Sequence, residues 1–94
     1  MKIYISGKIT GDKDYKHKFK VIKEYLIRAG HTIMNPAILP LGFEHEEYMK
    51  ICVAMLEVCD AIYMLTDWED SKGAKEEYEI AKSLGKEILF EHHN

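Results

Sequence analysis

The chain has 94 residues, of which 47% are hydrophobic and 31% are charged. This composition excludes a disordered chain, and the length predicts one domain, residues 1–94, near the lower size limit for a sizeable core. No apolar run approaches the roughly 18 residues of a membrane span, and MKIYISG at the N-terminus is too polar for a signal peptide. We therefore expect a cytoplasmic protein that has no membrane partner.

The net charge of −3 is unevenly distributed along the chain. Residues 1–35 carry eight Lys or Arg against three acids, whereas residues 36–94 carry five against thirteen. A basic segment of this kind can attract phosphate or nucleic acid, but it is also typical of a solvated helix face.

The two cysteines, Cys52 and Cys59, lie seven positions apart in a predicted helix. They are therefore about 10 Å apart along the axis, too far for a disulfide, which needs Cα atoms within about 7 Å. Neither belongs to a CxxC pair, and the five histidines show no metal-ligand spacing with them. We expect two buried thiols and no metal site.

The first third of the chain predicts a strand, a helix and a second strand. KIYIS (2–6) is a compact β-prone run. In residues 14–30 the apolar side chains recur every three or four positions, as on one face of a helix that Asp14 can cap and Gly30 can end. HTIMN (31–35) predicts the second strand, which a proline-rich loop follows.

The remainder predicts two further helix–strand units. A helix is expected over residues 44–58 and another over 72–84, each with apolar residues at helical spacing. The intervening run 60–66 is apolar at nearly every position, which is typical of a strand covered on both faces. The last strand is expected at 87–91.

The predicted fold is therefore a small flavodoxin-like or Rossmann-like α/β three-layer sandwich. Alternating strands and helices favour a four-stranded parallel sheet, which we expect in the order 2-1-3-4, with three helices on its two faces. Ligands of such sheets bind beyond the carboxyl ends of the strands. Three loops would meet there: Ser6–Gly11, Asn35–Gly42 and Thr66–Gly73.

Two of these loops carry short motifs that suit an anion. SGKITG (6–11) offers glycines and Lys8 to a phosphate, although it is neither a Walker loop nor GxGxxG and also fits an ordinary tight turn. SKGA (71–74) resembles a helix start, where Ser71 and Gly73 would leave backbone N–H groups for an anion or would simply cap the helix.

The pattern alone leaves two alternatives open for Glu77 and two for Trp68. Glu77 falls in the second turn of the third helix, beside its inward face, so its carboxylate is expected to lean toward the pocket mouth. On periodicity alone, however, Glu77 is expected to be a surface acid. Trp68, the one tryptophan, suits stacking on a flat base or covering the core.

Three stretches taken together, YISGKITG, CDAIYML and WEDSKGAKEE, resemble the nucleoside 2-deoxyribosyltransferase-like superfamily. The similarity is greatest to its short, functionally undescribed branch, common in phages and bacteria, and it covers nearly the whole chain. The most specific part is the S-x-G-x-x-x-E pattern, matched by Ser71, Gly73 and Glu77.

The resemblance implies that Glu77 is the nucleophile, which attacks the anomeric carbon, displaces the base and forms a glycosyl intermediate. It implies a nucleoside or nucleotide substrate and no metal or cofactor. Tyr4 and the first loop would line the sugar or phosphate side, and Ser71 and Gly73 would hold a 5′-phosphate. The full set of expected substrate-binding residues, with our own base-side assignments of Asn35, Asp67 and Trp68, is Tyr4, Ser6, Gly7, Lys8, Gly11, Asn35, Asp67, Trp68, Ser71 and Gly73.

Two departures from the superfamily matter. Cys52 stands where active relatives carry an aspartate, and the chain ends at EHHN, soon after the last expected strand. His92, His93 and Asn94 could complete a pocket across a dimer or form a frayed tail. Because the core is small and relatives assemble through their helices, we expect a homodimer or higher homo-oligomer.

Three functions follow. The first is cleavage of the N-glycosidic bond of a nucleoside or nucleotide, or deoxyribosyl transfer. The second is a catalytically silent nucleotide-binding module of the same fold, which Cys52 favours. The third is nucleic-acid binding through the lysines of residues 8–23, which we do not expect because the acidic stretch 67–79 would face the same rim.

Overall fold

The computed structural model describes residues 1–91 and contains one four-stranded sheet with three helices. The strands pair in parallel in the order β2-β1-β3-β4, so the predicted order and fold class are confirmed. The strands are β1 (Lys2–Ser6), β2 (Thr32–Met34), β3 (Ala61–Met64) and β4 (Glu87–Phe90), and the helices are α1 (Tyr15–Arg28), α2 (His45–Glu57) and α3 (Lys72–Ser83).

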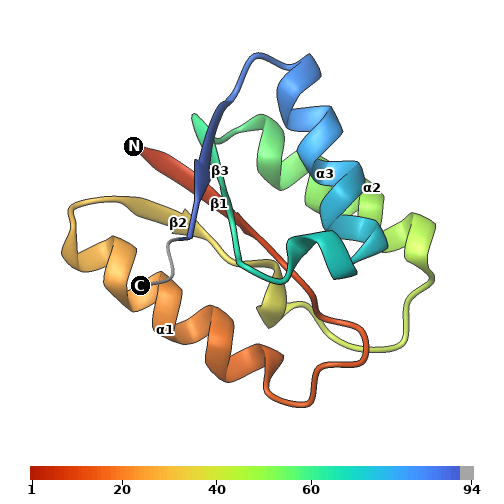
Figure 1. The fold of residues 1–94 in the computed structure, drawn as a ribbon. Helices are drawn as coiled ribbons and strands as arrows, with labels where there is room; N and C mark the ends of the chain where they lie inside the picture. The colour runs from red at the N-terminus through yellow and green to blue at the C-terminus, as the bar shows by residue number, and fades with distance from the viewer. Residues whose placement is uncertain (92–94) are drawn as a thin grey trace.

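The helices form two outer layers around the sheet. Helix α1 covers one face, and α2 and α3 lie together on the other (Figure 1). Strand β1 is central and buried on both faces: Ile3 and Ile5 pack in the cluster that holds α1, whereas Tyr4 packs in the cluster on the α2–α3 side. Because side chains alternate along a strand, Ser6 points to the same side as Tyr4. Two polar side chains of β1 therefore face α2 and α3.

The ends of α1 differ in part from the expectation. Asp14 occupies the N-cap position, but its side chain makes no capping hydrogen bond. The carboxylate of Asp12 instead accepts from the Asp14 backbone N–H at 2.9 Å, so an acid two residues earlier closes the turn. At the other end Gly30 has φ +96°, a left-handed conformation suited to glycine, which agrees with the predicted stop.

Both cysteines are free and buried, as predicted. Within residues 1–91 no helix is long and apolar enough to cross a membrane, and no three His, Cys, Asp or Glu side chains gather as a metal site. The expected role of His92, His93 and Asn94 lies outside the described residues.

Candidate functional site

A buried carboxylate lies at the centre of the site. Glu77, in the second turn of α3, is only 6% exposed. Its Oε2 accepts a hydrogen bond from the Tyr4 hydroxyl at 2.7 Å, and its Oε1 accepts one from the Ser6 hydroxyl at 2.6 Å. Both oxygens are thus held by donors from the central strand.

The sequence produces this arrangement through two periodicities. The alternation of β1 turns both Tyr4 and Ser6 toward α3. On α3, Ala74 and Ala81 lie three and four positions from Glu77 and are almost fully buried, and their small side chains let the helix approach the sheet closely. Glu77 therefore lies on the inward face, and the reading of it as a surface acid is wrong.

Burial controls the acidity of the central groups. Burial raises the pKa of Glu77 above its ordinary value, and the hydrogen bonds from Ser6 and Tyr4 offset only part of that rise. Burial, reinforced by the negative charge of Glu77, also raises the pKa of Tyr4 well above its ordinary value. The phenol consequently stays protonated at neutral pH and remains a donor to the carboxylate.

This raised pKa predicts a stability effect. A carboxyl group whose pKa is higher in the folded than in the unfolded chain contributes stability below its unfolded pKa, and that contribution is lost as the pH rises through the folded pKa. In the wild type, the free energy of unfolding should therefore fall as the pH rises. The fall should begin near pH 4.5, the ordinary pKa of a glutamate, and end at the raised pKa of the folded protein. Glu77→Gln should remove that fall and be the more stable protein at neutral pH.

Urea unfolding across a pH series, compared with Glu79→Gln, measures this effect. Glu79 is an exposed acid of the same helix that pairs only with Lys82 within the described chain, so its variant is a matched charge control. Curves for Glu77→Gln and wild type that stay parallel across this pH range would contradict the assignment of a destabilising buried carboxylate.

A cavity of about 540 Å³ opens beside the carboxylate. This volume lies within the range typical of small-molecule sites, and most of the lining is apolar. Six of the predicted residues line it together, and residues from all three helices and their preceding loops complete it. The predicted residues in the lining are Tyr4, Gly7, Gly11, Ser71, Gly73 and Glu77. The other lining residues include Tyr15, His45, Tyr48, Met49 and Cys52.

The start of α3 forms one edge of the cavity. The Ser71 hydroxyl accepts from the Ala74 backbone N–H at 3.1 Å, so Ser71 is the N-cap that the sequence predicts. A side chain on Gly73 would meet only ordinary contacts, from His45 and Met49 at 3.8 and 3.9 Å. The expected phosphate contacts of Ser71 and Gly73 stay a prediction.

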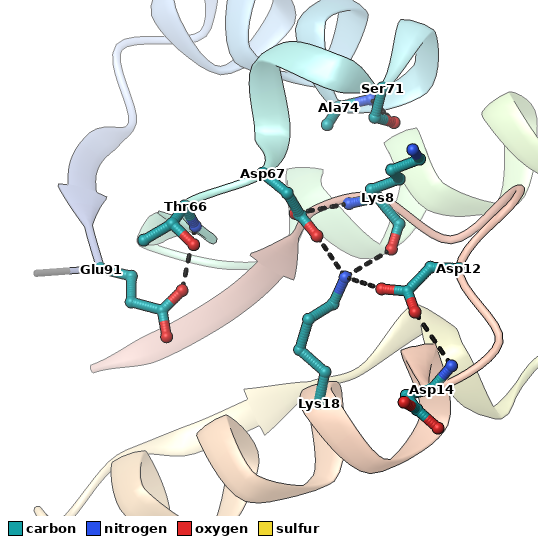
Figure 2. Close-up of polar contacts among 9 residues, drawn as sticks. All are labelled: Lys8, Asp12, Asp14, Lys18, Thr66, Asp67, Ser71, Ala74 and Glu91. Carbon is teal, nitrogen blue, oxygen red and sulfur yellow. Dashed lines mark hydrogen bonds and ion pairs between the residues drawn. The ribbon is translucent and has the colours of Figure 1, made fainter. Parts of the chain in front are cut away.

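Lys18 connects the two loops beside the cavity, the β1–α1 loop and the loop after β3, through hydrogen bonds and ion pairs. Its ammonium group donates to the carboxylates of Asp12 and Asp67 and to the Lys8 carbonyl, and the Lys8 backbone N–H donates to Asp67 at 3.0 Å (Figure 2). Burial alone would lower the pKa of Lys18, but the two carboxylates outweigh burial and raise it. The network ties the β1–α1 loop to the residues after β3.

Five predicted residues are not brought to the cavity wall, and four of them are held elsewhere by other contacts. Asp67 is held by Lys18, and the Lys8 side chain points away from that network (Figure 2). Asn35 turns its side-chain oxygen to the Ala37 backbone N–H at 2.9 Å, where it caps the 3₁₀ helix η1 (Pro36–Ile38). Trp68, in η2 (Trp68–Asp70), packs on Tyr78 with ring centroids 4.7 Å apart and so covers the core.

Ser6 also lies outside the cavity lining, because it is 1% exposed and reaches the site only through Glu77. Sequence reasoning missed Tyr15, His45 and Tyr48 as wall residues. Tyr15 and Tyr48 lie in the first turns of helices that start at the sheet's carboxyl edge, and this position was the available signal. Lys18 had no distinguishing signal among the neighbouring lysines.

The end of β1 approaches β3 too closely for any side chain at position 7. A Cβ on Gly7 would lie 2.7–2.9 Å from three side-chain atoms of Leu65, which is fully buried. We therefore expect Gly7→Ala to lower the free energy of unfolding by about 1–3 kcal/mol, the usual cost of overpacking.

Denaturant unfolding measures this cost, with Gly73→Ala as the control, since an added Cβ there has room and alanine suits a helix. The stability of Gly73→Ala should be unchanged or slightly higher. Equal stabilities for Gly7→Ala and wild type would contradict the close approach.

The chain is similar to a known protein family over nearly its whole length. The model of the family described as "Domain of unknown function (DUF4406)" matches residues 1–90. The chain belongs to this family. No curated protein matches the sequence significantly.

Solved structures share the fold of this DUF4406 domain. A 2-desoxiribosyltransferase from Leishmania mexicana is similar over 95% of this chain and 62% of its own, with TM-score 0.75 and 20% identity. A 2-deoxyribosyltransferase from Bacillus psychrosaccharolyticus is similar over 100% and 77% of the two chains, with TM-score 0.73 and 20% identity. The Clostridium botulinum CMP N-glycosidase BcmB is similar over 96% and 70%, with TM-score 0.70 and 16% identity.

The chain thus spans 62% of the length of the Leishmania mexicana protein. The fold is that of the 2-deoxyribosyltransferase-like proteins, as the sequence motifs predicted. At these identities the likeness concerns the fold, and activity has to be argued from the site.

Proposed function

We propose that this domain cleaves the N-glycosidic bond of a nucleoside or nucleotide, with Glu77 as the nucleophile. The observation that carries the proposal is the Glu77 carboxylate, buried at the wall of a ligand-sized cavity with both oxygens held by Tyr4 and Ser6. A carboxylate fixed in this way is suited to attack a sugar carbon that develops positive charge.

The reaction has two balanced steps. A Glu77 oxygen attacks C1′ of the sugar, the C1′–N bond breaks, and the base leaves with the bonding electrons and takes up a proton. The result is a glycosyl ester on Glu77. Water, or a second base, then attacks C1′, loses a proton and releases Glu77 as the carboxylate. With water the domain is a hydrolase, and with a base it is a transferase.

Tyr4 and Ser6 have a positioning role in these steps. Their hydrogen bonds favour the ionised form of Glu77 against the effect of burial, and they hold its plane fixed relative to the cavity. Ser71 and Gly73, at the start of α3, are the groups we expect to meet a 5′-phosphate if the substrate carries one.

The substrate class is supported by the printed names of the structural neighbours, two deoxyribosyltransferases and a CMP N-glycosidase. The apolar cavity walls suit the flat faces of a nucleobase. We therefore expect a nucleoside or its 5′-monophosphate, with deoxyribose or ribose as the sugar.

A second function is favoured by one observation at the same wall. Burial raises the pKa of the Cys52 thiol to about 11, so Cys52 is neutral at physiological pH. No negative group then stands where a second carboxylate is expected in active relatives. A domain that binds a nucleotide without cleaving it is the alternative.

Chromatography of the purified protein with pooled deoxynucleosides and their 5′-monophosphates separates these functions. Release of free base supports the hydrolase, and new nucleoside formed only when a free acceptor base is added supports the transferase. Retention of a nucleotide in equilibrium dialysis with no base release supports the binding module and contradicts the enzyme.

A further inference from the structure

A second cavity of about 310 Å³ lies between α1 and the segment after β2. Lys16, Lys20 and Lys23 line one side of it, at positions that share one face of α1. They neighbour the apolar stripe that packs on the sheet, so they stand at the edge of the helix and not on its outermost face. Ala37 lines this cavity and the larger one, so the two adjoin.

The second cavity is rich in hydrogen-bond donors. Within residues 1–91 the ammonium groups of its three lysines enter no ion pair, and Glu24 is its single carboxylate. Asn35 also lines it; since its side-chain oxygen already accepts from Ala37, its amide nitrogen is the group left to donate. Such a lining suits an anion that carries several charges.

The spacing of the charges indicates which anion. Lys16 to Lys23 covers seven residues, or about 10 Å along the helix at roughly 1.5 Å per residue. The three lysines are spread along this length, so their ammonium groups can meet successive phosphates of one extended single strand. A nucleoside monophosphate offers one phosphate group to this row of lysines, whereas a strand offers one at each nucleotide.

We propose that this groove, lined by Lys16, Lys20, Lys23 and Asn35, binds the backbone of single-stranded nucleic acid. The repulsion expected from the acidic stretch 67–79 does not reach it: Asp67 is paired with Lys18, and no acid of that stretch lines the groove. A strand whose terminal nucleoside enters the larger cavity can continue past Ala37 along the lysines. That last extension rests on the proposed function, whereas backbone binding by the groove does not.

Fluorescence anisotropy with a labelled single-stranded oligonucleotide of about ten nucleotides tests the proposal. For single strands, the logarithm of affinity falls with the logarithm of salt concentration with a slope of about −0.7 per phosphate contact. Three contacts predict a loss of affinity of about 20-fold between roughly 50 and 200 mM salt. The triple variant Lys16→Ala, Lys20→Ala, Lys23→Ala should bind more weakly and reduce the slope by about 2.

The matched control is Lys2→Ala, Lys50→Ala, Lys75→Ala, which changes the net charge equally at exposed lysines outside both cavities. Alanine suits the helical positions of these lysines, which are all of them except Lys2 of β1, and a thermal melt by circular dichroism verifies that each variant is folded. The control should keep most of the affinity and of the salt slope.

Equal affinity and slope in the groove variant and the wild type would overturn the proposal, as would an equal loss in the control. Displacement of the oligonucleotide by a polyglutamate peptide at equal charge concentration would also overturn it, because the groove would then recognise acidic peptides. The anisotropy measurement needs no turnover, so its outcome is independent of whether the protein releases base.

Discussion

Glu77→Gln is expected to reduce base release from the domain's substrate by at least about a thousandfold, because an amide cannot act as the nucleophile. Glutamine keeps the size of the side chain and can still accept from Tyr4 and donate to or accept from Ser6, so the cavity keeps its shape. The measurement is the rate of free base formation, followed by chromatography, at saturating substrate.

Glu79→Gln is the matched control, since it removes one charge from an exposed position of the same helix. It should keep the wild-type rate. Base release by Glu77→Gln at a rate within tenfold of wild type would show that another group performs the reaction.

Tyr4→Phe is expected to lower the rate about 10- to 100-fold at neutral pH. The variant removes a 2.7 Å hydrogen bond to the ionised carboxylate, and such bonds contribute about 1.5–3 kcal/mol. Loss of this donor raises the pKa of Glu77 further, because the Ser6 hydroxyl is then the one hydroxyl group left to counter the effect of burial. The acid limb of the kcat/KM profile should therefore move to higher pH.

The pH profile distinguishes this effect from a general loss of structure, which would lower the rate without moving the limb. Tyr63→Phe provides the control, because Tyr63 packs in the apolar cluster on the opposite face of the sheet. An unmoved acid limb in Tyr4→Phe would contradict the role of Tyr4 in setting the acidity of Glu77.

The fold was predictable because every element carries its own local signal. Strand β3 shows an unbroken apolar run, α1 repeats Phe19, Ile22 and Leu26 at helical spacing, and Gly30 marks a helix end with a left-handed φ. With alternation of strands and helices fixed, the right-handed crossover leaves few possible sheet orders, and 2-1-3-4 is the order observed.

The sequence predicted site residues only where the signal lies within a single helix, strand or loop. Glu77 followed from a motif, but its burial depends on Tyr4 and Ser6, more than seventy positions away, and no local pattern reports that pairing. Asp67 illustrates the converse: its position in a loop suggested a ligand contact, whereas Lys18 of helix α1 pairs with it.

Polar residues in loops have several partners within reach, and packing decides among them. Trp68 could cover either a ligand or the core, and the rings of Tyr78 and Phe90, on α3 and β4, draw it to the core. Sequence spacing places each of these residues near the rim but leaves the choice of partner open.

The configuration of the product tests the central claim, that Glu77 attacks the sugar directly. Two displacements at C1′ return the original anomer, whereas direct attack by the acceptor inverts it. With methanol as acceptor and a β-deoxynucleotide as substrate, proton NMR of the initial methyl glycoside should show the β anomer. An α product, or base release that gives an inverted sugar, would contradict a glycosyl intermediate on Glu77.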